Sequence, residues 1–195
     1  MLSIVSSRHQ MAFINDSTIV ITEYQSHCLR SFDYPDGGWK TFAGSCGESG
    51  SLHTGGRLAV RLNLPYGVAY DNDNTVYFTL ERDQKIISIK LDVSSCEVFY
   101  AFTTTAGLHY IKHSIPGNYL FVSTSDGYEV VDVDNTALLQ KQLKSSTVGF
   151  NYVSGVVQIE DQVWAISDTK NSRFTLTKNV IHKILAYHIM WIANR

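Results

Sequence analysis

A pattern of apolar and hydroxyl residues recurs along this chain in a fixed register, and it constrains the fold more than any other feature. The segment Gly67–Thr79 aligns without a gap on Gln10–Thr22, which begins 57 residues earlier, and the pattern returns 44 and 88 residues after Gly67–Thr79. One column contains a hydroxyl residue in every copy: Thr22, Thr79, Ser123 and Ser167. Another column is apolar throughout: Leu29, Ile86, Val130 and Phe174. Several columns in one register indicate a repeat protein.

Each copy alternates short strand-forming segments with turn residues. In the second copy, Asp71–Asn74 predicts a turn, because Asn and Asp side chains bond their own backbone and tolerate positive φ. The segments around it are rich in β-branched and aromatic residues and predict four strands: Gly67–Tyr70, Thr75–Leu80, Lys85–Leu91 and Glu97–Phe102. A unit of four strands and about 44 residues is typical of a propeller blade. An immunoglobulin-like sandwich would lack this fixed register, and leucine-rich or helical repeats have shorter periods or a helical pattern.

The first interval is longer than the others because of an insertion between Phe32 and Val68, which is rich in glycine and predicts one enlarged loop. We therefore expect an all-β fold, a β-propeller of about four blades, each with four antiparallel strands. The expected propeller occupies residues 1–179, with units near 10–66, 67–110, 111–154 and 155–179. Residues 180–195 form an apolar C-terminal tail with helical spacing of its apolar residues.

The segment that leads into the second copy, Thr41–Tyr70, resembles the linker between NHL repeats. The residues that carry the resemblance are Ala43, Gly44, Gly47, Asn63, Pro65, Gly67 and Ala69, with Leu62 at a position that is usually aromatic. Ser167–Phe174 resembles the end of an NHL repeat, and the third copy is the weakest match. The resemblance implies an incomplete six-bladed propeller of the NHL type, whose members mostly bind proteins or other ligands.

Three cysteines are present, and two of them fit the same resemblance. Cys28 and Cys46 lie in sequences similar to those of extracellular animal NHL proteins, which implies a Cys28–Cys46 disulfide and an extracellular location. A crosslink would also remove entropy from a long glycine-rich loop. The alternative is two buried free thiols, which pack as small apolar residues. Cys96 is left unpaired by this scheme, and Asn15-Asp16-Ser17 is a glycosylation acceptor sequence, with Asn15 in an expected turn.

Charge and hydropathy argue against several partners. The formal net charge is −2 and no basic stripe is present, which disfavours nucleic acid and anionic membrane surfaces. The first ten residues lack the apolar run of a secretory signal peptide, so the extracellular expectation rests on the cysteine pair. Val180–Ala193 is the most apolar segment, but it is shorter than the roughly 20 residues that a membrane-spanning helix needs.

No arrangement of residues predicts catalysis, a metal site or a cofactor. His109 and His113 are four residues apart, a spacing that suits metal binding on a helix but not on a strand. The alternative to a binding protein is a six-bladed-propeller enzyme, such as a peptide-amidating lyase or a lactonase-like hydrolase. The lyases hold a catalytic metal with several His near the central channel, and we find no His in equivalent columns of the inner strands.

We therefore expect a non-catalytic binding scaffold that recognises a protein or a small ligand through the loop face carrying Ser45–Arg61. Loops on rigid scaffolds carry binding, and aromatic and Arg side chains dominate binding energy. The candidates are Trp39, Arg57 and Tyr66; each has the alternative role of packing within its own blade. Because the ends of the chain do not resemble polar capping units, we expect further blades from a longer chain or a partner.

Overall fold

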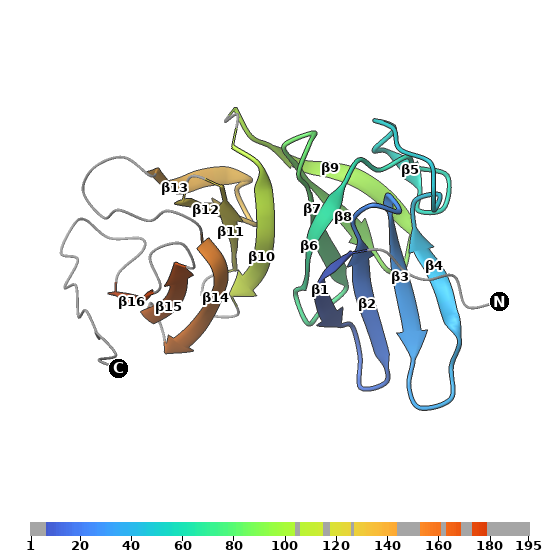
Figure 1. The fold of residues 1–195 in the computed structure, drawn as a ribbon, viewed down its shortest axis with the longest axis horizontal. Helices are drawn as coiled ribbons and strands as arrows, with labels where there is room; N and C mark the ends of the chain where they lie inside the picture. The colour runs from blue at the N-terminus through green and yellow to red at the C-terminus, as the bar shows by residue number, and fades with distance from the viewer. Residues whose placement is uncertain are drawn as a thin grey trace. The chain divides into compact units, whose positions relative to one another are not determined.

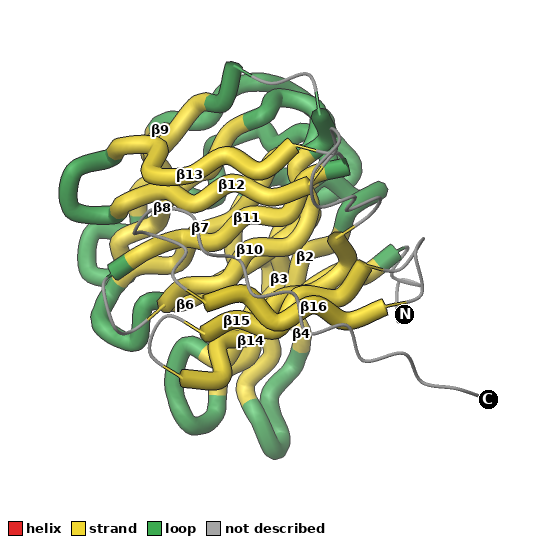
Figure 2. The backbone as a smooth tube through the Cα atoms, turned by 90° about the vertical axis from the view of Figure 1, so that its left-hand side faces the viewer, coloured by secondary structure: helices red, strands yellow, loops and turns green. Residues whose placement is uncertain are grey.

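A computed structural model describes residues 7–103, 106–114, 118–125, 127–143, 153–160, 163–168 and 173–178. The predicted tail at 180–195 lies outside these residues. The described parts form antiparallel sheets joined by loops and contain no helix, as Figure 2 shows. Accordingly, they offer no helix that could cross a membrane. The chain divides into two compact units, Met1–Ile111 and Lys112–Arg195, and the boundary falls within strand β10.

The first unit contains two blades. Blade 1 is a four-stranded sheet of consecutive neighbours: β1 (Arg8–Phe13), β2 (Thr18–Glu23), β3 (Cys28–Asp33) and β4 (Trp39–Ala43). Blade 2 has the order β5-β9-β8-β7-β6 and consists of β5 (Gly55–Gly56), β6 (Pro65–Tyr70), β7 (Thr75–Leu80), β8 (Lys85–Lys90) and β9 (Ser95–Ala101). The two inner strands, β1 and β6, lie next to each other, so the blades stand face to face (Figure 1). The four strands predicted in the second copy are therefore confirmed.

Two more sheets continue the repeat. One contains β10 (Leu108–Ser114), β11 (Tyr119–Thr124), β12 (Gly127–Asp132) and β13 (Ala137–Leu143), in sequence order. The other contains three described strands, β14 (Val153–Glu160), β15 (Val163–Asp168) and β16 (Arg173–Lys178). An all-β chain of consecutive antiparallel sheets is the predicted architecture, a partial β-propeller. The predicted unit boundaries stay a prediction.

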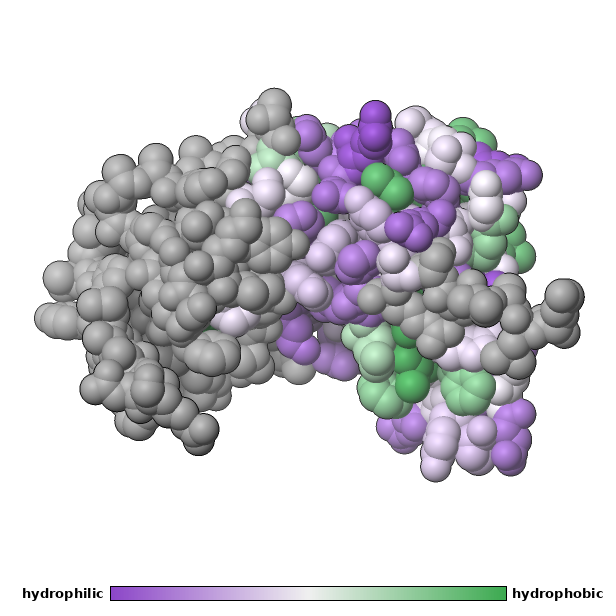
Figure 3. Space-filling view, viewed as in Figure 1, coloured by the Kyte–Doolittle hydropathy of each residue, from purple (hydrophilic) through white to green (hydrophobic). Residues whose placement is uncertain are grey.

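A hydrophobic core holds blades 1 and 2 together. Blade 1 contributes Val20, Leu29 and Phe42 to it, and blade 2 contributes Val76 and Phe78, all of them buried. These residues alternate along their strands with residues of the opposite face, so each strand gives one face to the interface. Burial of each such side chain stabilises the folded state by about 1.5–3 kcal/mol. In Figure 3 the visible surface of this unit is mostly polar, with a compact hydrophobic area near the lower ends of the blade 1 strands.

The hydroxyl column of the repeat connects one blade to the next. Thr22 donates to the carbonyl oxygen of Tyr66 at 2.7 Å, and Thr79 donates in the same way to the carbonyl oxygen of His109 at 2.7 Å. Thr79 Oγ1 also accepts a hydrogen bond from the Gly67 amide at 2.8 Å. Both threonines are fully buried. In the first two copies the hydroxyl therefore satisfies inner-strand backbone groups that water cannot reach.

The turn between the first two strands of a blade is built by an Asn or Asp side chain. Asp71 Oδ1 accepts hydrogen bonds from the amides of Asp73, Asn74 and Thr75 at 2.9–3.0 Å. Asn15 occupies the corresponding turn of blade 1. Such side chains replace the backbone partners that the turn residues lack. The turn predicted at Asp71–Asn74 is confirmed.

Candidate binding surface

The inserted loop, residues 44–64, is fastened to both blades. The predicted disulfide is present: Cys28, at the start of β3, is bonded to Cys46, and their Cα atoms are 5.0 Å apart, within the range for an unstrained crosslink. At the other side, β5 pairs with β9 and so adds a fifth strand to blade 2. Within the loop, Leu52 forms an isolated bridge with Arg61. The disulfide, the strand pair and the internal bridge therefore fix the backbone of the loop against both blades.

A buried polar cluster makes the third attachment. His53 Nε2 lies 2.7 Å from Asp83 Oδ2, and its Nδ1 lies 3.2 Å from the Lys85 ammonium. Because an ammonium can only donate, Nδ1 accepts and the Nε2 proton is directed to the Asp83 carboxylate. Asn63 Nδ2 donates to the other Asp83 oxygen at 3.4 Å. His53 is buried and Asp83 and Lys85 are partly exposed, so this cluster connects the loop to the β7–β8 turn through one buried imidazole.

Two large apolar side chains project from this loop. Leu52 is 54% exposed and Leu58 is 57% exposed. Between them, the Arg57 guanidinium lies over the Phe42 ring, 4.8 Å from its centroid, and the Arg57 amide donates to the Ser94 carbonyl. An apolar side chain held at the surface by a rigid backbone loses little entropy when a partner covers it.

The three residues predicted for binding do not come together on one surface. Arg57 lies in the loop, but Trp39 begins β4, at the opposite end of that strand from the loop, and contacts Phe32 with ring centroids 5.1 Å apart. Tyr66 is 9% exposed and belongs to an inner-strand cluster. Their assignment to binding stays a prediction.

The inner-strand cluster joins blade 1, blade 2 and the beginning of β10. The Tyr66 ring stacks on His9 at 4.0 Å between centroids and contacts His109 at 4.7 Å. The Glu81 carboxylate accepts a short hydrogen bond from Tyr24 and lies 3.6 Å from His109 Nε2. Tyr66 and His109 occupy equivalent positions, because the hydroxyl column bonds their carbonyls alike, and His9 lies 57 residues before Tyr66, at the same place in the first copy. The expectation that inner-strand columns contain no His is therefore wrong.

The cluster has its own electrostatics. The His109 side chain, and then the Tyr24 hydroxyl, hold the pKa of Glu81 below its ordinary value. Burial lowers the pKa of His9, although the Glu81 carboxylate opposes this shift. His9 Nε2 is buried and has no hydrogen-bond partner among the described residues. The cluster therefore favours a neutral His9 beside a charged Glu81.

One group of possible metal ligands occurs among the described residues, but it is not available to a metal ion. Among them, Glu23, Cys28 and Cys46 are the group of three whose ligand atoms all lie within 4.8 Å of one another. The disulfide occupies both sulfurs of that group, and thiolates rather than disulfides ligate metals. Cys96 is a buried free thiol, and burial raises its pKa to about 12, so it stays protonated and unreactive at neutral pH.

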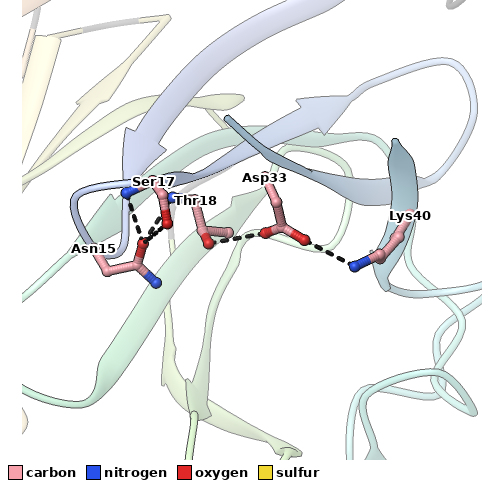
Figure 4. Close-up of polar contacts among 5 residues, drawn as sticks. All are labelled: Asn15, Ser17, Thr18, Asp33 and Lys40. Carbon is pink, nitrogen blue, oxygen red and sulfur yellow. Dashed lines mark hydrogen bonds and ion pairs between the residues drawn. The ribbon is translucent and has the colours of Figure 1, made fainter. Parts of the chain in front are cut away.

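The glycosylation acceptor lies at the end of blade 1 that carries the β1–β2 turn. Asn15 Oδ1 accepts hydrogen bonds from the Ser17 and Thr18 amides at 2.9 and 2.7 Å, and its amide nitrogen points away from these partners (Figure 4). Beside it, Asp33 accepts from Thr18 and forms a 2.8 Å ion pair with Lys40, which lowers the pKa of Asp33. Glycosylation of the exposed Asn15 stays a prediction.

Comparison with known proteins supports the fold alone. No family model and no curated protein matches the chain. A chain of the nidogen/laminin complex has a similar fold, with a TM-score of 0.61 and 14% identity, covering 89% of this chain and 65% of that one. Virginiamycin B lyase from Staphylococcus aureus has a TM-score of 0.67 and 12% identity, covering 95% of this chain and 55% of the lyase. Both are β-propellers, so a binding complex and an enzyme share this architecture.

Proposed function

We propose that this chain is a non-catalytic binding scaffold of the NHL-repeat type, and that the loop at residues 44–64 binds a protein. The observation that carries the proposal is the display of Leu52 and Leu58 on a loop fastened by a disulfide, a strand pair and a buried His–Asp pair. Exposed apolar side chains on rigid loops favour a protein partner over a small polar ligand.

The disulfide also supports an extracellular location, since disulfides persist in oxidising compartments. Sequence resemblance supports the NHL type, because the linker residues that carry it surround the same loop. A protein partner is in keeping with the nidogen/laminin complex among the similar structures. Nothing in the charge distribution favours nucleic acid.

The test begins with capture from conditioned medium on the immobilised chain, followed by mass spectrometry. The dissociation constant of the captured protein is then measured for the wild type and for the double variant Leu52→Ser, Leu58→Ser. We expect a loss of roughly tenfold or more, about 1.4 kcal/mol, because both side chains would lie in the covered area. The matched control is Tyr34→Ser, which alters a 65% exposed residue in the β3–β4 turn. Equal affinity for all three proteins would remove the loop from the interface.

A second candidate, a six-bladed-propeller enzyme such as a peptide-amidating lyase or a lactonase-like hydrolase, is favoured by one observation. His9 and His109, from two inner strands, both contact Tyr66, and Glu81 of the β7–β8 turn lies 3.6 Å from His109 Nε2. Metal analysis of the purified chain, a peptide-amidating lyase assay and turnover of a lactone test it. Turnover that Glu81→Gln abolishes, with the fold intact by circular dichroism, would establish the enzyme and displace the scaffold.

A further inference from the structure

The disulfide of blade 1 lies beside a buried carboxylate. Glu23 ends β2 directly opposite Cys28, which begins β3, and it is 3% exposed. Its Oε2 lies 4.0 Å from Cys28 Sγ, and the possible ligand atoms of Glu23, Cys28 and Cys46 all lie within 4.8 Å of one another. Three side chains that ligate metals when they are ionised therefore meet at one point, from β2, β3 and the inserted loop.

The spacing of these atoms is close to that of ligands around one zinc ion. In a tetrahedral site, Zn–S bonds of about 2.3 Å and Zn–O bonds of about 2.0–2.2 Å place sulfur and oxygen about 3.6 Å apart. The distance between Glu23 and Cys28 differs little from this. Two thiolate sulfurs on one zinc ion are about 3.8 Å apart, so the sulfurs must separate once their bond is broken. Cys28 is buried and Cys46 is exposed, so rotation of the Cys46 side chain supplies this movement.

The surroundings balance the charge of such a site. Arg30 Nη1 lies 3.9 Å from Cys46 Sγ, and Thr41 Oγ1 lies 3.6 Å from the same sulfur. Arg30 Nε is buried and has no hydrogen-bond partner among the residues that the structure describes. Two thiolates and a carboxylate carry three negative charges, a zinc ion carries two positive ones, and the guanidinium supplies the third. Donors placed in this way orient the ligands and tune the metal.

We propose that Cys28, Cys46 and Glu23 bind a zinc ion when the disulfide is reduced, with water in the fourth position on the exposed side of Cys46. In the oxidised chain the two sulfurs are bonded to each other, and the site is closed to metal. Thiolate ligands select zinc over magnesium or calcium. The site uses neither Leu52 nor Leu58, so it is independent of the partner proposed for the loop.

The reductant that opens the site is a dithiol. One of its thiolates attacks the exposed Cys46 Sγ and forms a mixed disulfide, while Cys28 leaves and takes up a proton. The second thiol of the reductant then displaces Cys46, so the reductant ends as a disulfide and the chain has gained two electrons and two protons. Zinc displaces both thiol protons when it binds. The ion then holds the chain reduced, because the Glu23 carboxylate repels a free thiolate at Cys28 but shares a zinc ion with it.

Metal titration of the whole chain in both redox states tests the site. The chain is reduced with dithiothreitol, desalted under argon and titrated with Cd²⁺, whose bonds to thiolates absorb in the ultraviolet. Zn²⁺ is then added as a competitor. We expect one Cd²⁺ per reduced chain, displaced by Zn²⁺, and no such band in the oxidised chain. A reduced chain without the band, or an oxidised chain with an equal one, would overturn the proposal.

Substitution of the carboxylate distinguishes the site from a simple pair of thiols. Glu23→Gln should lower the zinc affinity of the reduced chain at least tenfold, because a neutral amide replaces a charged ligand. The matched control, Glu48→Gln, changes an exposed carboxylate that pairs with Arg61 at 2.8 Å, and it should leave the affinity unchanged. Cys96→Ser, which removes the buried free thiol, should also leave it unchanged. Equal affinities of Glu23→Gln and the wild type would remove Glu23 from the site and refute the assignment.

A measurement on the wild-type chain avoids any dependence on how the variants fold. The reduced chain is treated with iodoacetamide, and modification of Cys46 is followed by peptide mass spectrometry. Zn²⁺ should slow this modification at least tenfold, whereas Mg²⁺ should not, because magnesium takes oxygen ligands. Circular dichroism should show that the reduced chain keeps its sheets. Equal rates in the two ions, or loss of the sheets on reduction, would contradict a zinc site built into blade 1.

Discussion

The hydroxyl column makes a quantitative prediction at Thr79. Its Oγ1 accepts from the Gly67 amide at 2.8 Å and donates to the His109 carbonyl oxygen at 2.7 Å, and the residue is 0% exposed. Thr79→Val preserves the shape of the side chain and removes both hydrogen bonds. The Gly67 amide and the His109 carbonyl oxygen then stay buried without these hydrogen bonds.

The magnitude follows from the two groups left behind. Each unsatisfied buried polar group costs about 1–3 kcal/mol, and partial relaxation makes a total of about 2–4 kcal/mol reasonable for Thr79→Val. The matched control is Thr79→Ser, which keeps the hydroxyl and removes only a buried methyl group, at about 1 kcal/mol. Serine already occupies this column at Ser123 and Ser167, so the smaller residue is compatible with the repeat.

The assay is urea unfolding of the 195-residue chain, followed by circular dichroism and by tryptophan fluorescence, with the free energy of unfolding taken from linear extrapolation. The valine variant should lose at least 1 kcal/mol more stability than the serine variant. If serine costs as much as valine, the methyl group and not the hydroxyl holds the blades together, and the interpretation of the column is refuted.

Three further predictions concern the same unit. Cys46→Ser should lower the free energy of unfolding by about 3 kcal/mol, because the disulfide closes a separation of 18 residues; urea unfolding measures it, and added reductant should then change nothing more. Gly67→Ala should destabilise by about 3 kcal/mol in the same assay, since its Cβ would come within 2.8 Å of the Ile111 amide nitrogen, whereas Gly38→Ala meets no atom within 4 Å and should be tolerated. Stability should decrease as the pH falls below 6.5, because burial lowers the pKa of His9 and the unfolded chain then binds more protons; His9→Phe should make the urea midpoint less dependent on pH, and an unchanged slope would contradict this.

The blades could be predicted from the sequence because their determinants are local. A turn such as Asp71–Asn74 is built by its own side chains, and strand alternation requires only β-branched and aromatic residues at every second position. The hydroxyl column was visible for a related reason. Thr22 and Thr79 bond the backbone, which every residue has, so the same residue type recurs whatever surrounds it.

The inner-strand cluster could not be predicted, and two physical causes explain this. Tyr24 and Glu81 occupy the same position in successive copies, 57 residues apart. They differ in chemistry because one is the donor and the other the acceptor of a hydrogen bond between the two blades. A search for columns of like residues therefore misses them. Moreover, a step of 44 from Tyr66 leads to Tyr110, whereas the structure uses His109, one residue earlier. On a strand, a shift of one residue exchanges the two faces, so a small error in the period selects the wrong side chain.

The glycines of the inserted loop locate it in the sequence. Its attachment to the blades depends on one column of the repeat, whose residue holds the loop by a different kind of contact in each blade. Cys28 and Lys85 occupy the same place in successive copies, and each holds the inserted loop, the first by the bond to Cys46 and the second by donating to His53. The loop is therefore covalently attached to blade 1 near its beginning and attached by polar contacts to blade 2 in its middle. Because Leu52 immediately precedes His53, the displayed apolar surface is fixed mainly relative to blade 2. Stability and recognition thus depend on different anchors: the disulfide limits the unfolded chain, and the buried His–Asp pair orients the surface that we propose meets the partner.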